Sequence, residues 1–211
     1  RRQRQMCIRD SCPAPDAPGS KQVAALMTIT GLIDAPKADK EFLSINGAQG
    51  FSTFYGYYML EAMATAGNYQ GALDVIREYW GAMIDLGATS FWEDFDINWI
   101  PNATPIDELV PEGKKDIHGD CGAYCYVGFR HSLCHGWASG PTSWLSRHIL
   151  GVEVIEPGCR QVRITPHLGD LQWVKGTFPT PYGEIQIYHE KQANGNVISE
   201  VKAPKGVSVI K

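Results

Sequence analysis

The spacing of apolar residues changes at Gly151, and this change constrains the fold more than any other feature of the sequence. Before Gly151, apolar residues recur every three or four positions, which is typical of helices that bury one face. After it, apolar and polar residues alternate, as in strands, at residues 162–165, 184–188 and 198–201. Asn194-Gly195 separates the last two segments and predicts a tight hairpin turn. The sequence therefore predicts an α+β chain, with a helical domain at residues 20–150 and a small antiparallel sheet domain at residues 151–211.

Capping residues, glycines and prolines divide the helical domain further. Ser20 can cap a first helix that ends near residues 31–34, and a loop containing Pro36 is expected to follow. Further helices are expected at residues 53–66, 69–86 and 141–150.

The helices at residues 53–66 and 69–86 differ in polarity. The first carries Glu61 as its one charged residue, so we expect it to be buried on nearly all sides. The second has a single apolar stripe, formed by Leu73, Ile76, Trp80 and Ile84. A buried helix followed by an amphipathic one is the pattern of an inner and outer helix pair in a concentric helical barrel, and it also fits other helical bundles.

Composition excludes two kinds of partner. The 211 residues carry a formal net charge of −4 and a sequence pI of about 5.9, which argues against nucleic acid. No stretch approaches the run of about 18 apolar residues that a membrane helix requires, so no membrane partner is expected.

Residues 1–19 differ from the rest of the sequence. They contain four arginines, three prolines and no hydrophobic periodicity. The run from Met6 to Ser11 also matches the translation of a transposon end that is used to build sequencing libraries. We expect an unstructured segment, either a sequencing artefact or a natural basic tail. It has no signal-peptide core, so the protein is expected to be periplasmic or secreted if a missing N-terminal part carries a signal, and otherwise cytoplasmic.

The densest group of chemically useful side chains follows the third expected helix. Glu93, Asp94 and Asp96 lie within four residues, beside Trp92 and near Trp99. Aromatic faces can hold a sugar ring, and an ionised carboxylate can remove a proton from the water that attacks the anomeric carbon. The alternative is a solvated acidic turn, or carboxylates that cap the next segment.

A second group contains six potential metal ligands. They are His118, Cys121, Cys125, His131, Cys134 and His135. Their spacing does not match the common zinc sites, so we expect free, mostly buried thiols, hydrogen-bonded histidines, and no metal or cofactor. Cys134 with His135, or Ser132 with His131, would form a nucleophile pair only if adjacent residues faced each other, which is uncommon.

Four separated motifs occur in the order typical of a known family. They are residues 87–93 (GATSFWE), residues 134–137 (CHGW) with 145–147 and Gly151, residues 157–166, and residues 180–183 (TPYG). Together they resemble bacterial α-L-rhamnosidases, glycoside hydrolase family 78. Over residues 20–211 the resemblance implies part of an (α/α)6 six-hairpin barrel, followed by a C-terminal antiparallel β-sandwich.

The resemblance also implies roles for individual residues. Glu93 corresponds to the general base of the family's Trp-Glu motif, and His135 to a histidine of the sugar subsite. Trp92 is expected to form an aromatic wall, and Asp94 or Asp96 to orient Glu93 or to bind sugar hydroxyls. The expected substrate-binding residues are Trp92, Asp94, Asp96, Trp99 and His135.

The implied activity is inverting hydrolysis of terminal α-L-rhamnosyl groups from oligosaccharides, polysaccharides or glycosides. The family's general acid lies far upstream and has no counterpart here, so we expect a C-terminal fragment that is inactive alone and partners the missing N-terminal part of its own chain. Asp94-Phe95 replaces the Arg-Trp that often follows the family's motif, which leaves another sugar as an alternative. Two further alternatives are a catalytically inactive binding protein, and a carbohydrate-binding module stabilised by zinc on Cys121, Cys125, Cys134 and His135.

Overall fold

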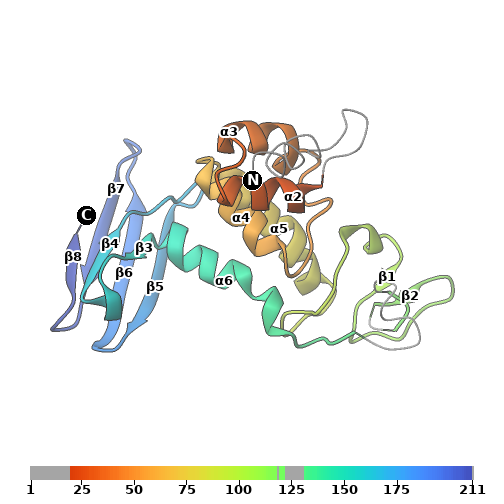
Figure 1. The fold of residues 1–211 in the computed structure, drawn as a ribbon. Helices are drawn as coiled ribbons and strands as arrows, with labels where there is room; N and C mark the ends of the chain where they lie inside the picture. The colour runs from red at the N-terminus through yellow and green to blue at the C-terminus, as the bar shows by residue number, and fades with distance from the viewer. Residues whose placement is uncertain (1–19, 118, 122–130, 211) are drawn as a thin grey trace. The chain divides into compact units, whose positions relative to one another are not determined.

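The computed structural model describes residues 20–117, 119–121 and 131–210. They form two compact units, which meet in the sequence between Pro141 and Thr142 (Figure 1). This division lies inside helix α6, N-terminal to the boundary predicted at residues 150–151. The first unit is mainly helical and the second consists mainly of strands, which confirms the predicted α+β class.

Three helices form the frame of the first unit. They are α2 (Lys21–Ile29), α4 (Gly56–Thr65) and α5 (Tyr69–Asp85). α4 packs against both α2 and α5. These helices agree with the predicted ranges, but the partial (α/α)6 barrel is not confirmed by them and stays a prediction.

Local signals set the ends of these helices. Ser20 and Asn68 cap α2 and α5, and each side chain accepts a backbone N–H of the first turn. Gly67 and Gly87 follow α4 and α5 with φ angles of 80° and 89°. A side chain in this left-handed region costs about 1–2 kcal/mol, so glycine is the residue that ends such helices most easily.

The segment around Pro36 is helical, and the predicted loop is wrong there. α3 (Ala35–Ala38) continues directly into a π-helical turn, η1 (Asp39–Leu43). Asp34 caps α3 by accepting the Lys37 N–H at 3.1 Å. Pro36 lies in the first turn, where its missing N–H has no helical partner to lose.

The buried face of α5 is rotated relative to the predicted stripe. Leu73 and Trp80 are buried as predicted, but the Ile84 side chain is 69% exposed. Met83 is buried in its place, on the same face as Val75 and Tyr79. The buried residues of α5 are therefore Ala72, Leu73, Val75, Tyr79, Trp80 and Met83.

The segment after α5 contains little regular structure. It holds the 3-10 turn η2 (Ile97–Trp99), the short parallel strands β1 (Ala103–Thr104) and β2 (Lys115–Asp116), and the 3-10 turn η4 (Gly136–Ala138). α6 (Gly140–Trp144) follows and continues as the π-helical turn η5 (Leu145–Ile149). Within the described ranges, no helix is long and apolar enough to cross a bilayer.

Two three-stranded sheets form the second unit. The first contains β3 (Val152–Val154), β4 (Gln161–Ile164) and β8 (Ser208–Ile210), with the turn η6 (Pro157–Cys159) between β3 and β4. The second contains β5 (Trp173–Thr180), β6 (Gly183–Lys191) and β7 (Val197–Lys202).

Strand pairing follows the predicted antiparallel pattern with one exception. β5, β6 and β7 form an antiparallel meander, and the hairpin turn at Asn194-Gly195 joins β6 to β7 as predicted. β3 and β4 are also antiparallel, but β8 pairs with β4 in parallel. The chain passes from one sheet to the other between β7 and β8, so a crossover rather than a hairpin sets the direction of β8.

Both sheets contribute to one hydrophobic core. Its buried members are Leu150, Val152, Val162, Ile164, Ile185 and Ile187. Along β6, Ile185, Ile187 and His189 face this core, while Gln186 and Glu190 are exposed. The alternation in the sequence is therefore the alternation between the two faces of the sheet.

His189 is a buried polar residue at the edge of this core. Its Nδ1 lies 2.7 Å from Ser199 Oγ, and its Nε2 lies 3.1 Å from the carbonyl oxygen of Leu150. Burial lowers the pKa of His189 below its usual value, although the bond to Leu150 acts in the opposite direction.

We expect Gly151→Ala to destabilise the protein more than Gly158→Ala. Both glycines have a φ of 73°, so both substitutions carry the left-handed penalty of about 1–2 kcal/mol. A Cβ at Gly151 would lie 2.3 Å from the backbone carbonyl of Thr165, whereas nothing lies within 4 Å at Gly158. Overpacking adds about 1–3 kcal/mol at Gly151, which urea unfolding of the two variants measures. Equal losses would contradict this account of Gly151.

We also expect acid to destabilise the second unit through His189. Because its folded pKa lies below the usual 6.5, the unfolded chain binds more protons than the folded one as the pH falls below 6.5. The contribution of His189 to stability is complete above pH 6.5 and is lost below it. His167, whose pKa is lowered by burial and by His148, adds to the same trend.

Urea unfolding across this pH range measures the effect. His189→Gln removes one titrating group, so the free energy of unfolding should depend less steeply on pH than in the unmodified chain. An unchanged slope would show that His189 does not contribute to the acid sensitivity.

Candidate active site

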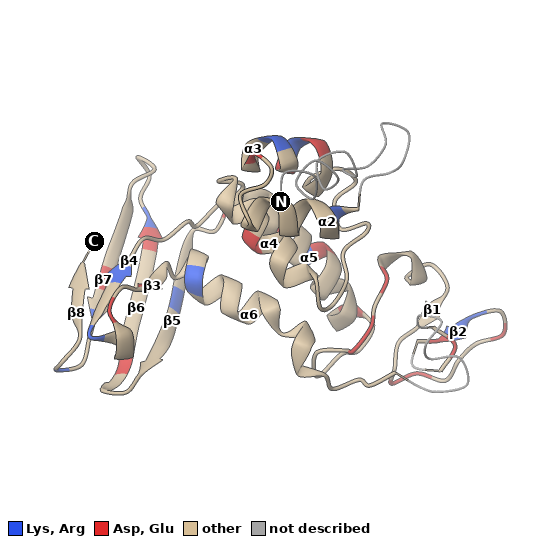
Figure 2. Cartoon of the chain, viewed as in Figure 1, with Lys and Arg blue, Asp and Glu red and all other residues tan. Residues whose placement is uncertain are grey.

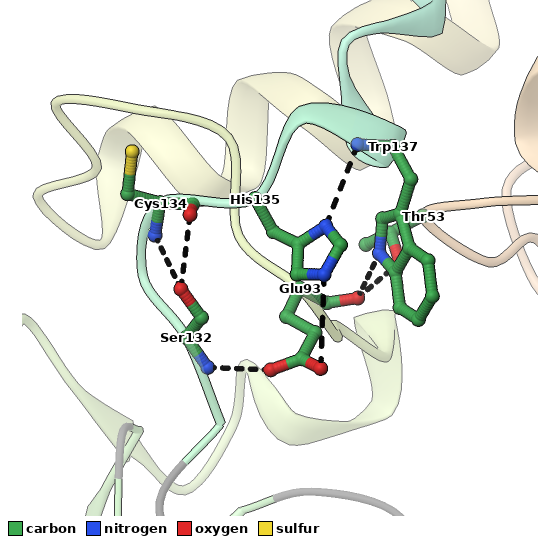
Figure 3. A network of polar contacts seen from close by, with 6 residues as sticks. All are labelled: Thr53, Glu93, Ser132, Cys134, His135 and Trp137. Carbon is green, nitrogen blue, oxygen red and sulfur yellow. Dashed lines mark hydrogen bonds and ion pairs between the residues drawn. The ribbon is translucent and has the colours of Figure 1, made fainter.

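Two extended segments of the first unit pair through their backbones and bring the candidate residues together (Figure 3). The Glu93 N–H donates to the carbonyl oxygen of Ser132 at 2.8 Å, and the His135 N–H donates to that of Phe91 at 2.7 Å. Gly87 turns the chain after α5 into the first of these segments. Glu93 and His135, which lie in two separate motifs of the resemblance, are therefore side by side.

The Glu93 carboxylate has two differently placed oxygens. Oε2 accepts the backbone N–H of Ser132 at 2.7 Å, a charge-assisted hydrogen bond when the carboxylate is ionised. Oε1 lies 3.9 Å from Nε2 of His135. The side chain of Glu93 is 19% exposed, so solvent can reach the group even though it is held in place.

The backbone carbonyl of Glu93 is fixed by two donors from other parts of the chain. Thr53 Oγ1 donates to it at 2.6 Å, and the Trp137 indole N–H donates at 2.8 Å (Figure 3). Because a carbonyl oxygen has two lone pairs, these bonds hold the backbone from two directions.

His135 is oriented by its neighbour Trp137. The Trp137 backbone N–H approaches Nδ1 at 3.5 Å, which makes that nitrogen the acceptor and Nε2 the protonated nitrogen in the neutral ring. The two rings lie 4.1 Å apart at an angle of 32°. This arrangement turns Nε2 toward the Glu93 carboxylate, as Figure 3 shows.

Neither Trp92 nor Trp99 is fully exposed, as a ring that offers an open face to a sugar would be. The Trp92 ring is completely buried and packs edge-on against Phe95, 5.9 Å away. Its indole N–H has no hydrogen-bond partner among the described residues. Trp99 is half-buried, with its ring 5.9 Å from Phe95 and 6.0 Å from His131. Both rings support the loop, and their predicted sugar contacts stay predictions.

The two predicted aspartates also differ from each other. Asp96 is exposed and caps η2, accepting the Asn98 backbone N–H at 2.9 Å. The capping role that was the alternative for this cluster is thus what Asp96 performs here. Asp94 is half-buried and lies near Tyr79, whose pKa is raised by burial first and by Asp94 next.

The metal and nucleophile hypotheses find no geometric support in the part of the chain that the structure describes. No three His, Cys, Asp or Glu side chains gather there as metal ligands, while His118 and Cys125 lie outside the described residues. Figure 3 shows the Cys134 sulfur pointing away from His135. Cys121, Cys134 and Cys159 are unpaired, and none of them is fully buried, unlike the prediction.

Sequence reasoning did not find Thr53 or the backbone role of Ser132. The signal for Ser132 was its position three residues before His135 in an extended segment. Once His135 pairs beside Phe91, antiparallel geometry carries Ser132 to Glu93. The hydroxyl of Thr53 gave no comparable signal, because it reaches Glu93 across 40 residues of sequence.

Chemically, this site offers a solvent-accessible carboxylate, a neighbouring imidazole and an indole, Trp137, that is 42% exposed. A held carboxylate can accept a proton from water, and an imidazole can share hydrogen bonds with a hydroxylated ligand. The aromatic ring can cover the apolar face of such a ligand.

Comparisons with known proteins identify similar sequences and folds. The family model of the bacterial alpha-L-rhamnosidase C-terminal domain matches residues 151–210. The GH78 family rhamnosidase of Bacillus sp. GL1 is 26% identical with a TM-score of 0.67, over 90% of this chain and 18% of that one. A comparison with curated proteins finds no match.

Two further solved structures share the fold. The α-L-rhamnosidase of Aspergillus terreus is 18% identical with a TM-score of 0.72, over 97% of this chain and 23% of that one. The Streptomyces avermitilis α-L-rhamnosidase complexed with L-rhamnose is also 18% identical, with a TM-score of 0.68, over 97% and 19%.

By its fold and by these comparisons, the chain is similar to part of a class of glycoside hydrolases. More particularly, residues 151–210 match the C-terminal domain of bacterial α-L-rhamnosidases, and the chain as a whole is similar to part of a GH78 family rhamnosidase. It spans 18% to 23% of the length of these three solved relatives.

We expect Thr53→Val to lower the free energy of unfolding by about 1 kcal/mol, because it removes one of the two donors to the partly buried Glu93 carbonyl. Thr65→Val is the matched control, since its hydroxyl bonds to the exposed backbone of its own helix, at Glu61. Urea unfolding compares the two variants. A loss at Thr53 no larger than that at Thr65 would show that this bond does not hold the site.

Proposed function

We propose that this chain supplies the general-base half of an inverting α-L-rhamnosidase active site, with Glu93 as the base. The observation that carries the proposal is the setting of the Glu93 carboxylate. One oxygen is held by the Ser132 N–H, while the other lies 3.9 Å from Nε2 of His135, in a side chain that is 19% exposed.

In the proposed reaction, Glu93 removes a proton from a water molecule as that water attacks the anomeric carbon. The leaving-group oxygen takes a proton from a general acid on the opposite side of the sugar. In inverting enzymes the two carboxyl groups lie about 6.5–9.5 Å apart, which leaves room for the water. We assign the acid to a part of the longer relatives that this chain does not match.

His135 and Trp137 would hold the sugar beside Glu93. The Nε2–H of His135 can donate to a sugar hydroxyl as well as to Glu93, because the two groups are 3.9 Å apart and not locked in a short bond. Trp137 offers an exposed ring beside His135, whereas the buried Trp92 supports the loop from within. We therefore propose Trp137 as the aromatic surface for the sugar.

Rhamnose is the proposed sugar because two independent likenesses point to it. The family model belongs to a rhamnosidase domain, and one of the solved relatives is complexed with L-rhamnose. Asp94-Phe95, directly after Glu93, is the difference from the family motif that keeps another sugar as the second candidate.

The test is Glu93→Gln in an enzyme that contains this chain together with the upstream part of its relatives. We expect kcat/KM for a chromogenic α-L-rhamnoside to fall by a factor of about 100 or more, since a general base contributes on this scale. Binding of L-rhamnose should change little, because the amide keeps the shape of the side chain. The 211-residue chain alone is expected to release no rhamnose.

Glu112→Gln is the matched control, because it is the same substitution at an exposed residue of the first unit. It should leave kcat/KM unchanged. Full activity in Glu93→Gln would remove Glu93 as the base, and rhamnose release by the chain alone would remove the need for an acid from outside it. Cleavage of other glycosides in preference to the rhamnoside would favour the second candidate.

A further inference from the structure

The outward face of the β5–β6–β7 sheet holds a hollow that the proposed active site does not use. Its volume is about 460 Å³, which is within the usual range of ligand sites. Gly176 and Ile187 form part of its lining, and the polar side chains that line it are Lys175, Thr177, Gln186, Tyr188, Glu200 and Lys202. All six lie in the second unit, whereas Glu93 and His135 lie in the first.

Strand register arranges these side chains in rows across the sheet. Lys175, Tyr188 and Glu200 are direct neighbours in one row, and Thr177, Gln186 and Lys202 form the next. Adjacent rows lie about 6.8 Å apart along a strand, which is the scale of one sugar ring. The backbone hydrogen bonds of the sheet therefore fix the spacing of the polar groups.

Trp173 extends the face beyond the hollow. It opposes Glu190 in the row before Lys175 and is 60% exposed. Its ring lies 6.5 Å from that of Tyr188, at an angle of 30°. Two aromatic rings with similar orientation on one exposed face provide flat apolar surface of the kind that stacks against a sugar ring.

The polar groups of the face are both donors and acceptors. The lysines donate, Glu200 accepts and Gln186 does both, which matches hydroxyl groups that donate and accept in turn. Tyr188 donates to Glu190 at 3.1 Å, so its hydroxyl is already oriented. Figure 2 shows charges of both signs on this sheet, whereas the centre of a protein interface is usually depleted of charge.

We propose that this face binds an oligosaccharide chain, with one sugar ring against Trp173 and the next over the hollow beside Tyr188. It is a non-catalytic site, because it retains a glycan rather than cleaving it. The inference does not depend on the proposed function, since it rests on residues of the second unit alone.

Affinity electrophoresis of the 211-residue chain tests this site without any hydrolysis. The gels contain either rhamnogalacturonan, which carries carboxylates, or galactomannan, which is neutral. We expect retardation by at least one polysaccharide, and an affinity about tenfold weaker in Trp173→Ala, which loses the exposed ring. Glu200→Gln should also weaken binding, and neither exposed substitution should alter the circular dichroism spectrum.

Tyr182→Ala is the matched control, because Tyr182 is an exposed aromatic residue of the same unit that packs near Gly206, away from the hollow. It should bind like the unmodified chain. Lys175→Ala separates two sources of affinity: a loss confined to rhamnogalacturonan assigns the ammonium group to a carboxylate, and a loss with both assigns it to hydroxyls. Retardation by neither polysaccharide, or retardation that Trp173→Ala leaves unchanged, would overturn the proposal.

Discussion

The candidate active site depends on how the backbone of Glu93 is held. Its N–H donates to Ser132, and its carbonyl accepts from both Thr53 and Trp137, so every polar group of this peptide segment has a partner from a distant part of the chain. The side chain can then be partly exposed without being free to move, because its attachment point is fixed. Trp137 serves twice, since it also orients the imidazole of His135. Trp137 thus links the position of Glu93 to the orientation of the His135 ring.

The two units hold their candidate site residues by different means. In the first unit the residues lie on irregular loops, so individual hydrogen bonds and ring contacts must supply the order that a helix or strand would give. In the second unit, strand register sets the spacing of the side chains on the exposed face of β5, β6 and β7. The core on the other side of that sheet, with Ile185 and Ile187 at its centre, keeps the register from slipping by one residue.

Much of the fold followed from the sequence because short-range signals decide it. Ser20 set the start of α2, and alternation set the faces of β6. The loop predicted at Pro36 is wrong because proline, which is common in loops, also fits the first turn of a helix, here after the cap Asp34. The prediction for Ile84 is wrong because Met83 and Ile84 both fit the spacing of three or four residues after Trp80, and it is Met83 that is buried.

The candidate site was predictable only in part, for the same reason. A local motif marked Glu93 and a second one marked His135, but their proximity and the roles of Thr53 and Ser132 depend on contacts that cross 39 to 44 residues of sequence. Each of these contacts joins two separate stretches of chain, so losing them would open the loop around Glu93 without unfolding a helix. Circular dichroism of the helices would therefore not report whether the Glu93 carboxylate is held, whereas hydrogen exchange at the backbone N–H groups of Glu93 and Ser132 would.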